Sequence, residues 1–457
     1  MEYVSKNLKK LAKDDFPVHK LYIVLVLLFG IIFSTAMPIF QEQDGQYHFA
    51  TASAMADLPV NLSNYGEYAV GSGTDNQRQF YQNGTHFQQF YLQKVQIIPQ
   101  EDVPRKINAL SSKFNYDYMG HIIPALGVWI GYHIYPSLGV MTVVARLLNL
   151  FVCAIMMFFI IKWVKKGKLL FACVMLSPVA IISFASLSYD AINFVWVAFL
   201  IAYMINMLVS PKLSLKKEIP IIGGLGIIGI LWFKTNYLVL FVMLAIILFN
   251  YLINRYYGDN LGQQRAKRKI ITIISLVSLV AASGAFYYWS HGNGGVRHVV
   301  ARLWASFGII STPTPNLISQ TLLAQSNRGQ NGLPYWIAGV WFALLICILL
   351  VEDKYVKSKI VSFGALGVFG VSILAVYMAF ISYNNAISGQ IYGVQGRYFT
   401  PVLLLLSLFI SNEKFKLKIK PKGTIIFIMI IIVIVSNTLI VTNTLSNMHG
   451  LFVEMRG

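Results

Sequence analysis

Two carboxylates stand close together where the chain should be leaving a membrane. Glu42 and Asp44 follow the first long apolar run, and His48 lies four residues after Asp44, on the same face if the segment is helical. An acid at this position suits a general base that removes a proton from an acceptor hydroxyl. A second acid beside it holds a divalent cation or raises the pKa of the first by like-charge repulsion. The spacing leaves both schemes open, together with the simple reading of a solvated helix end.

Three basic side chains are candidates for binding an anion at the same membrane surface. Arg397 lies between Gly396 and Tyr398 at the expected outer end of a span, and Lys234 closes another span. Arg302 belongs to a predicted interfacial helix. A lipid-linked phosphate at this depth would need charge-assisted pairing of this kind. The alternative for Arg397 is a snorkelling side chain in an aromatic belt.

Further polar residues are expected inside or beside the spans. Arg146 lies several residues into the second span, where a charge is costly unless it is paired or faces a polar cavity. Asp190 is its expected partner, so the two form either a structural ion pair or a substrate contact. We also expect Tyr47, His48 and Tyr398 to contact substrate. His121 and His133 are interpreted as packing residues.

The composition predicts a membrane protein that crosses the bilayer many times. Hydrophobic residues make up 56% of the 457 residues, charged residues only 12%, and the mean hydropathy is +0.61. The formal net charge of +19 comes from short basic clusters between apolar runs, which is typical of cytoplasmic loops. No basic surface is interleaved with aromatic residues, so a nucleic-acid partner is excluded. Cys153, Cys173 and Cys347 all lie in apolar runs, which excludes a disulfide framework.

We expect one all-α membrane domain over residues 1–457 with a cytoplasmic N-terminus and about eleven spans. A long first extracytoplasmic loop (41–137) contains an interfacial helix at 119–135. A second large outer loop (290–333) contains an amphipathic helix at 296–307. The predicted spans are 21–40, 138–163, 169–186, 188–209, 219–233, 236–253, 270–289, 334–351, 359–382, 398–411 and 423–443.

Four short patches resemble bacterial membrane glycosyltransferases of the GT-C superfamily, which use polyprenyl-phosphate sugars. Glu42-Gln43-Asp44 looks like the acidic pair of their first outer loop. A less characterised branch shows a Pro-Asp-Glu-x-x-His-Phe pattern, an Arg-x-x-Asn, a Ser-x-Ser-x-Asp turn and a late Gly-Arg-Tyr. The corresponding residues here are Asp44 with His48-Phe49, Arg146 with Asn149, Ser186 to Asp190, and Gly396 to Tyr398. Gln43 and Gly45 depart from that pattern.

The resemblance implies an inverting sugar transfer at the outer face of a bacterial plasma membrane. Asp44 would be the base, with Glu42 beside it, and Arg397, Arg302 and Lys234 would hold the donor phosphate. The donor would be a polyprenyl-phosphate sugar, and the acceptor a cell-wall or surface polysaccharide. Metal dependence stays open.

Three alternatives stay open beside this one. The first is a transporter or flippase for a lipid-linked or anionic solute. The second is an acyltransferase using His48 or His121, and the third is a ligase that transfers a whole polymer.

Overall fold

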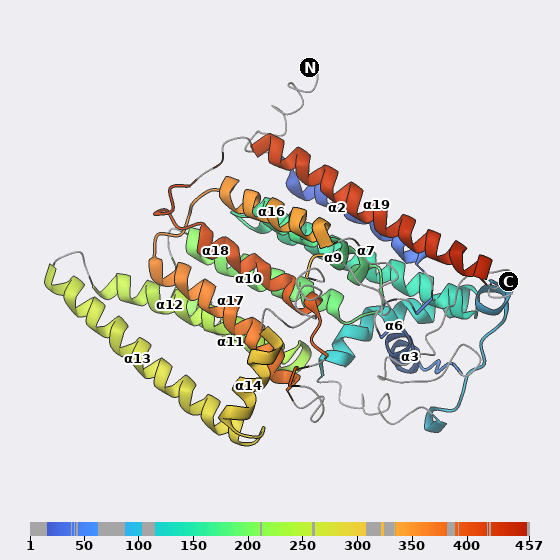
Figure 1. Ribbon diagram of the computed structural model, residues 1–457, viewed down its shortest axis with the longest axis horizontal. Coiled ribbons are helices and arrows are strands. Elements are labelled where there is room, and N and C mark those ends of the chain that lie inside the picture. The colour runs from blue at the N-terminus through green and yellow to red at the C-terminus, as the bar shows by residue number, and fades with distance from the viewer. Residues whose placement is uncertain are drawn as a thin grey trace, which may run out of the picture.

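The protein is helical throughout the part that the computed structural model describes. That part comprises residues 16–37, 39–40, 42, 44–62, 87–102, 115–210, 213–257, 261–307, 321–323, 333, 335–381, 389–391, 393–417, 419 and 422–454. Within these ranges there is no strand, only two isolated bridges at Val60–Ile97 and Val356–Asn412. Most of the long helices lie roughly parallel in a bundle, and the helices of residues 45–55 and 116–134 lie at one end of it (Figure 1).

Seven of the eleven predicted spans are helices long and apolar enough to cross a membrane. They are α2 (Val18–Ala36), α7 (Leu138–Trp163), α10 (Asp190–Val209), α12 (Leu240–Tyr256) with the turn before it, α13 (Leu261–His291), α17 (Lys359–Ala379) and α19 (Lys422–Glu454). Each contains an apolar stretch of about the length that a bilayer core requires.

The other four predicted spans have a different form. Residues 169–186 form two short helices, α8 (Lys168–Met175) and α9 (Pro178–Phe184), because Pro178 cannot continue a helix. Pro401 similarly follows a first 3-10 turn, η5 (Gly396–Phe399), and opens a second, η6 (Pro401–Leu405), before α18 (Leu406–Ile410). Helix α16 (Tyr335–Val351) has 17 residues, and α11 (Leu215–Trp232) has three charged residues in its first turn. The count of eleven spans is therefore not confirmed.

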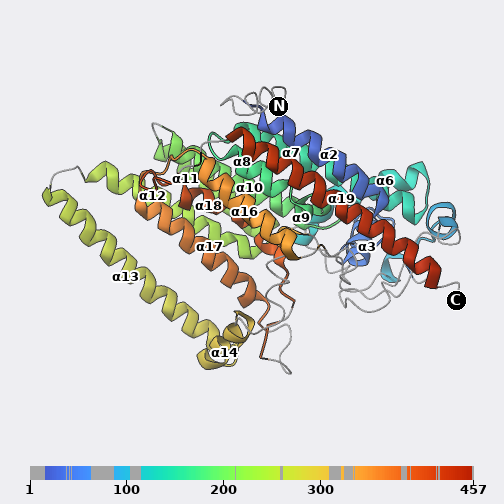
Figure 2. The same ribbon diagram turned by 45° about the horizontal axis from the view of Figure 1, so that its top comes forward.

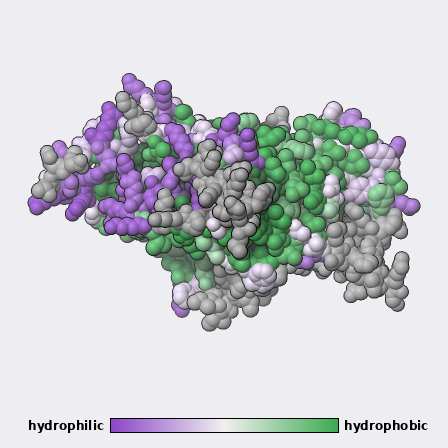
Figure 3. Space-filling view, turned by 90° about the horizontal axis from the view of Figure 1, so that it is seen from above, coloured by the Kyte–Doolittle hydropathy of each residue, from purple (hydrophilic) through white to green (hydrophobic). Residues whose placement is uncertain are grey.

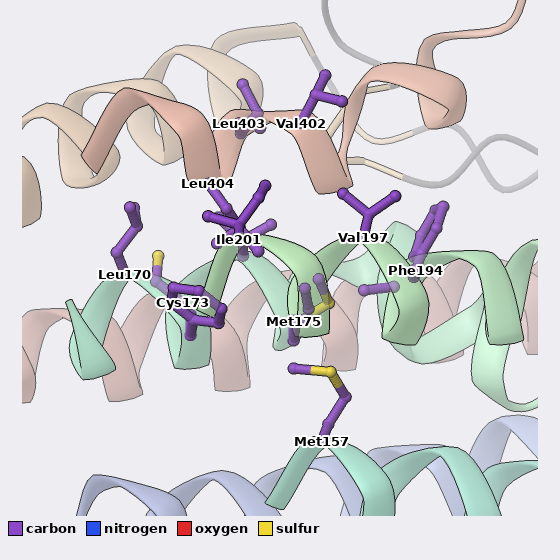
Figure 4. Close-up of a cluster of buried hydrophobic side chains, with 14 of the residues drawn as sticks. Met157, Leu170, Cys173, Met175, Phe194, Val197, Ile201, Val402, Leu403 and Leu404 are labelled. Carbon is purple, nitrogen blue, oxygen red and sulfur yellow. The ribbon is translucent and has the colours of Figure 1, made fainter. Parts of the chain in front are cut away.

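The broken segments are packed around α10, the most deeply buried of the seven long helices. Met157 of α7, Cys173 of α8, Ile201 of α10 and Leu404 of η6 lie in one apolar cluster and are fully buried (Figure 4). Irregular backbone at membrane depth is tolerated when protein surrounds it. The breaks in α8–α9 and η5–η6 therefore lie where other helices shield them.

The segment predicted to be the first outer loop is organised by two helices, α3 (Gly45–Met55) and α6 (Tyr116–Ile134), which pack against each other. The predicted interfacial helix at 119–135 is present as α6, and it packs along α7. Gly127 makes this close approach possible, since a Cβ there would lie 2.4 Å from the Cα of Ala145. Small residues thus bring α6, and α3 with it, against the first membrane helices.

Helix α13 leaves the bundle at an angle and ends beside α14 (Val296–Phe307), as both ribbon views show (Figures 1 and 2). None of the apolar window of α13 is buried. The predicted amphipathic helix 296–307 is α14, but its apolar side is split. Val299 and Arg302 face the protein, whereas Val300 and Trp304 are exposed. The rest of the second outer loop, at 308–320 and 324–332, lies outside the described residues.

Candidate functional site

A tight turn between α2 and α3 directs the two predicted acids to opposite sides. Phe40 and Asp44 both adopt positive φ angles, 64° and 58°, and the Gly45 N–H donates to the Glu42 carbonyl at 3.1 Å. A side chain at Gly45 would not fit, because its Cβ would lie 2.8 Å from the Cα of Phe40. Non-glycine residues rarely occupy this region of φ, and such conformations often mark functional sites.

Glu42 is buried and forms an ion pair with Arg146. Its Oε1 accepts from Nε of Arg146 at 3.2 Å, Oε2 pairs with Nη2, and Nη1 of Arg146 donates to the Met37 carbonyl at 2.7 Å. Neither side chain is more than 4% exposed. The prediction that Arg146 pairs with Asp190 is therefore wrong. The turn places the Glu42 carboxylate on Arg146, and Asp190 pairs with other cations. Glu42 locks the turn onto α7 and does not join Asp44 at the accessible surface.

Asp190 begins α10, and the Ser-x-Ser-x-Asp segment positions it. The Ser186 hydroxyl accepts from the Ser188 N–H, and the Ser188 hydroxyl accepts from the Asp190 N–H, each at 3.2 Å. Asn149 of α7 holds this turn by donating to the Ser186 carbonyl at 2.8 Å. Two of the sequence patches thus serve the same local structure.

Asp190 binds two cations, and one of them reaches Asp44. Its Oδ1 lies 2.6 Å from Nζ of Lys234, and its Oδ2 lies 2.7 Å from Nε of Arg397. Nη2 of Arg397 then donates to Oδ2 of Asp44 at 3.4 Å. The Asp190 side chain is fully buried, whereas the Asp44 side chain is 35% exposed. The four charges alternate in sign along a line that ends at an accessible carboxylate.

Lys234 forms one wall of a cavity of about 200 Å³. Its ammonium group lies 4.3 Å from the ring centres of both Tyr189 and Tyr398, close enough for cation–π attraction. Burial lowers the pKa of Lys234, and the adjacent Asp190 carboxylate opposes that shift. The other lining residues are two aromatic ones, two small apolar ones, a threonine and an asparagine: Tyr116, Phe380, Val376, Ala379, Thr235 and Asn236.

Two hydrogen bonds between side chains and backbone groups stabilise the wall of this cavity. The Lys234 N–H donates to the Asn193 side chain at 3.0 Å, and the Tyr237 hydroxyl donates to the Tyr398 carbonyl at 3.2 Å. Gly120 of α6 lies against Tyr189, and a Cβ at that position would be 2.2 Å from the Tyr189 Cβ. The cavity wall is therefore fixed from α6, α10 and the segment before α12.

His48 and His121 form a buried pair beside the site. Nδ1 of His121 lies 2.6 Å from the Asp117 carbonyl, so it carries the proton, and Nε2 of His121 accepts from Nδ1 of His48 at 2.8 Å. Burial lowers the pKa of His121 to about 4. Burial, followed by the neighbouring His121, Arg397 and Lys234, lowers the pKa of His48 well below its usual value. Both rings are neutral. Neither is accessible, so the expected substrate contact of His48 is not a direct one in this structure.

Asp117 and Tyr47 complete the polar surroundings. Burial raises the pKa of Asp117, and the adjacent Tyr47 and Tyr116 hydroxyls and the charge of Lys234 oppose that shift. Sequence reasoning missed Asp117, Tyr116, Tyr189 and Asn193. An acid next to the Asn115 cap of a helix, with tyrosines on both sides, was the available signal for Asp117.

Arg302 lies apart from the residues just described. It is buried, and its guanidinium donates to the backbone carbonyls of Ile381 and Gln390, the latter at 3.2 Å. Arg302 therefore ties α14 to the end of α17 and the following segment. Its expected role at a donor phosphate has no geometric support among the described residues.

One protein-family model matches most of this chain. A family model described as "Predicted membrane protein (DUF2142)" matches residues 27–406. The chain belongs to the DUF2142 family. The matched region contains every residue of the Asp44–Arg397–Asp190–Lys234 network and the Glu42–Arg146 pair. No curated protein and no solved structure matches significantly.

The DUF2142 description identifies a predicted membrane protein and names no chemistry. The chemistry must therefore be inferred from the geometry of the site. Among the residues that the structure describes, no group of three His, Cys, Asp or Glu side chains is placed to hold a metal ion. What the site offers is an accessible carboxylate, two oriented cations and an aromatic cavity.

Proposed function

We propose that this protein transfers a sugar from a polyprenyl-phosphate donor to a glycan acceptor with inversion at the anomeric carbon. The observation that carries the proposal is the position of Asp44. It is the accessible end of a charge network whose other end, Lys234, lines an aromatic cavity. A base, a phosphate-binding cation and a sugar-sized space thus belong to one connected structure.

Asp44 is the proposed base. Its carboxylate accepts the proton of an acceptor hydroxyl while that oxygen attacks the anomeric carbon of the donor. The bond from the anomeric carbon to the phosphate oxygen breaks, and polyprenyl phosphate leaves with the electron pair. Arg397 holds the Asp44 carboxylate on one side, so the base is oriented before substrate arrives.

Lys234 is the proposed ligand of the leaving phosphate. Its ammonium has three donors, one of which is directed to Asp190, and it faces the cavity between two tyrosine rings. Charge develops on the phosphate as the glycosidic bond breaks, and an oriented cation in a largely buried site stabilises that charge. This assignment moves the main anion contact from Arg397, favoured by sequence, to Lys234.

The cavity is the proposed sugar site. Its volume of about 200 Å³ leaves room for a sugar ring. Tyr116, Tyr189 and Tyr398 supply ring faces and hydroxyls, and Asn236 supplies an amide. Apolar residues of α17 on one side, Val376 and Ala379, fit the start of an isoprenoid tail. By the basic-loop pattern, this end of the bundle faces the outside of a bacterial plasma membrane.

The direct test is transfer by purified protein in liposomes that contain a radiolabelled polyprenyl-phosphate sugar. Asp44→Asn should reduce transfer by about 10²–10⁴-fold, the usual contribution of a general base, with little change in donor binding. Asp57→Asn is a matched control, since Asp57 follows the same helix α3, is exposed and has the same positive φ of 58°. Wild-type transfer by Asp44→Asn would refute the proposed base. Chelator titration in the same assay reports metal dependence.

The transporter alternative is tested by the same liposomes. Transporter sites usually lie near the bilayer midplane between repeated halves, whereas this network lies at helix ends: Asp190 is the first residue of α10 and Lys234 precedes α12. That position favours chemistry at a membrane surface. Movement of the labelled lipid between leaflets with no new glycosidic bond would support transport instead.

A further inference from the structure

A second large cavity, of about 740 Å³, lies at the other end of the bundle. It is formed where α10 and α12 end and where α13 and α17 begin. Helix α10 has Asp190 at one end and Val209 at the other, which is about 30 Å at 1.5 Å per residue. Helix α17 likewise contributes Val376 to the first cavity and Ile360 to the second. The two cavities are therefore on opposite sides of the membrane domain.

The second cavity is rich in cations and hydrogen-bond donors. Lys267, Lys354 and Lys357 line it, and Glu413 is the one acid among the lining residues that the structure describes. Lys165 lies at its edge and donates to the Ser210 hydroxyl at 3.3 Å. The same end of the molecule presents the hydrophilic side chains gathered on the left of Figure 3. Four lysines around one space create a strong preference for an anion.

The side-chain contacts around the cavity orient these donors. Asn250 accepts from the Ser358 hydroxyl at 2.7 Å, and Asn254 accepts from the Lys267 ammonium, both through Oδ1. Because each amide oxygen is used in this way, each NH₂ group is left to donate. Lys354 is held by the Ile410 carbonyl at 3.0 Å. The resulting set of ammonium and amide donors suits the oxygens of a phosphate group.

We propose that this cavity binds the phosphate headgroup of an anionic phospholipid in the adjacent leaflet. Leu208, Val209, Ile360 and Val361 also line it, so apolar side chains continue from the cationic region toward the hydrocarbon. A phospholipid matches both the cationic region, through its phosphate, and the apolar lining, through its acyl chains. A free phosphate matches only the cationic region. Basic pockets between membrane helices at this depth are known to suit such headgroups.

The bound lipid would also stabilise the position of α13. The apolar window of α13 is not buried at all, yet Lys267 near its start lines the cavity together with Lys357, which precedes α17. A headgroup contacting both lysines links α13 to the bundle at the end remote from α14. This role is independent of the proposed sugar transfer.

The test uses the full-length protein in detergent, with the melting temperature and native mass spectra measured in phosphatidylglycerol and in phosphatidylcholine. We expect phosphatidylglycerol to raise the melting temperature and to remain bound. The double substitution Lys267→Gln with Lys357→Gln should weaken phosphatidylglycerol binding by about tenfold or more, since each lysine near an anionic headgroup contributes about 1 kcal/mol. Lys216→Gln with Lys217→Gln is the matched control, because these exposed lysines begin α11 at the same end but do not line the cavity.

Three results would overturn the proposal. An equal loss in the Lys216/Lys217 control would show that a diffuse basic surface binds the lipid. Binding of glycerol 3-phosphate as tightly as phosphatidylglycerol, with the same loss in the Lys267/Lys357 variant, would identify a soluble phosphorylated ligand. Retained phosphatidylglycerol selectivity in the Lys267/Lys357 variant would also exclude this cavity.

Discussion

Arg397 connects two carboxylates that come from distant parts of the chain. Its Nε lies 2.7 Å from Asp190 at the start of α10, and its Nη2 lies 3.4 Å from Asp44 before α3. One carboxylate is buried and also bound to Lys234, and the other is accessible. The guanidinium therefore positions the proposed base relative to the proposed phosphate ligand, and its planar geometry allows it to reach both acids at once.

Replacing Arg397 with lysine should affect the chemical step more than donor binding. A single ammonium cannot reach Asp190 and Asp44 from separate nitrogens, so Asp44 loses its orienting contact. We expect kcat to fall by about 10–100-fold with a smaller change in KM, measured with the liposome transfer assay. A rise in KM at unchanged kcat would instead make Arg397 a ground-state ligand of the donor.

Replacing Lys234 should weaken donor binding, because this cation lines the cavity. Lys234→Met should raise KM for the lipid-phosphate sugar by about tenfold or more. The substitution also leaves Asp190 with one partner fewer, which costs stability. Lys234→Arg separates these effects, since it keeps a cation beside Asp190 and should retain more stability and a lower KM than Lys234→Met. Loss of stability at an unchanged KM in Lys234→Met would assign Lys234 a purely structural role.

The Glu42–Arg146 pair should govern stability. Glu42→Gln leaves the Arg146 guanidinium buried without its carboxylate, and breaking one side of a buried ion pair costs about 3–5 kcal/mol. The loss should be visible as a lower thermal midpoint in detergent. Glu42→Leu combined with Arg146→Met removes both charges and should regain much of that stability. If Glu42→Gln keeps wild-type stability but loses transfer, Glu42 acts in the chemistry instead.

The buried histidine pair should make the protein sensitive to acid. The pKa of His121 is about 4 in the fold and 6.5 when exposed, so between these values the unfolded chain binds protons that the folded chain does not. Stability is thus complete above pH 6.5 and falls as the pH is lowered toward 4, by up to about 3 kcal/mol from His121. Chemical unfolding at several pH values measures this slope. His121→Gln removes the titrating group and should flatten it, and an unchanged slope would contradict the assignment.

Gly120 should be required for the cavity wall. A methyl group there would lie 2.2 Å from the Cβ and 2.8 Å from the Cα of Tyr189, so Gly120→Ala must shift α6 or Tyr189, whose ring lies 4.3 Å from the Lys234 ammonium. We expect lower transfer activity and a lower melting temperature. Gly339→Ala in α16 is the control, because nothing lies within 4 Å of a Cβ at that position. The control should be neutral or slightly stabilising.

The membrane helices could be predicted largely from local sequence. Seven apolar runs became helices that contain most of each expected span, although α13 and α19 are about ten residues longer than predicted. Length and hydropathy largely decide whether a segment can satisfy its backbone across a bilayer. The same criteria failed at 169–186 and 398–411. Pro178 and Pro401 break the helix there, and the surrounding helices shield the broken backbone, which local hydropathy does not report.

The sequence by itself determined that two acids follow the first span and that Arg397 immediately precedes the predicted span 398–411. The structure places Arg397 beside one of these acids, Asp44. Only the tertiary structure decided which charges pair. Glu42 and Asp44 are two residues apart, yet the turn with positive φ angles at Phe40 and Asp44 directs buried Glu42 to Arg146 and partly exposed Asp44 to Arg397. Ion pairs follow distances between helices, and those distances come from close approaches such as that of Gly127 to Ala145. No local spacing of residues encodes them.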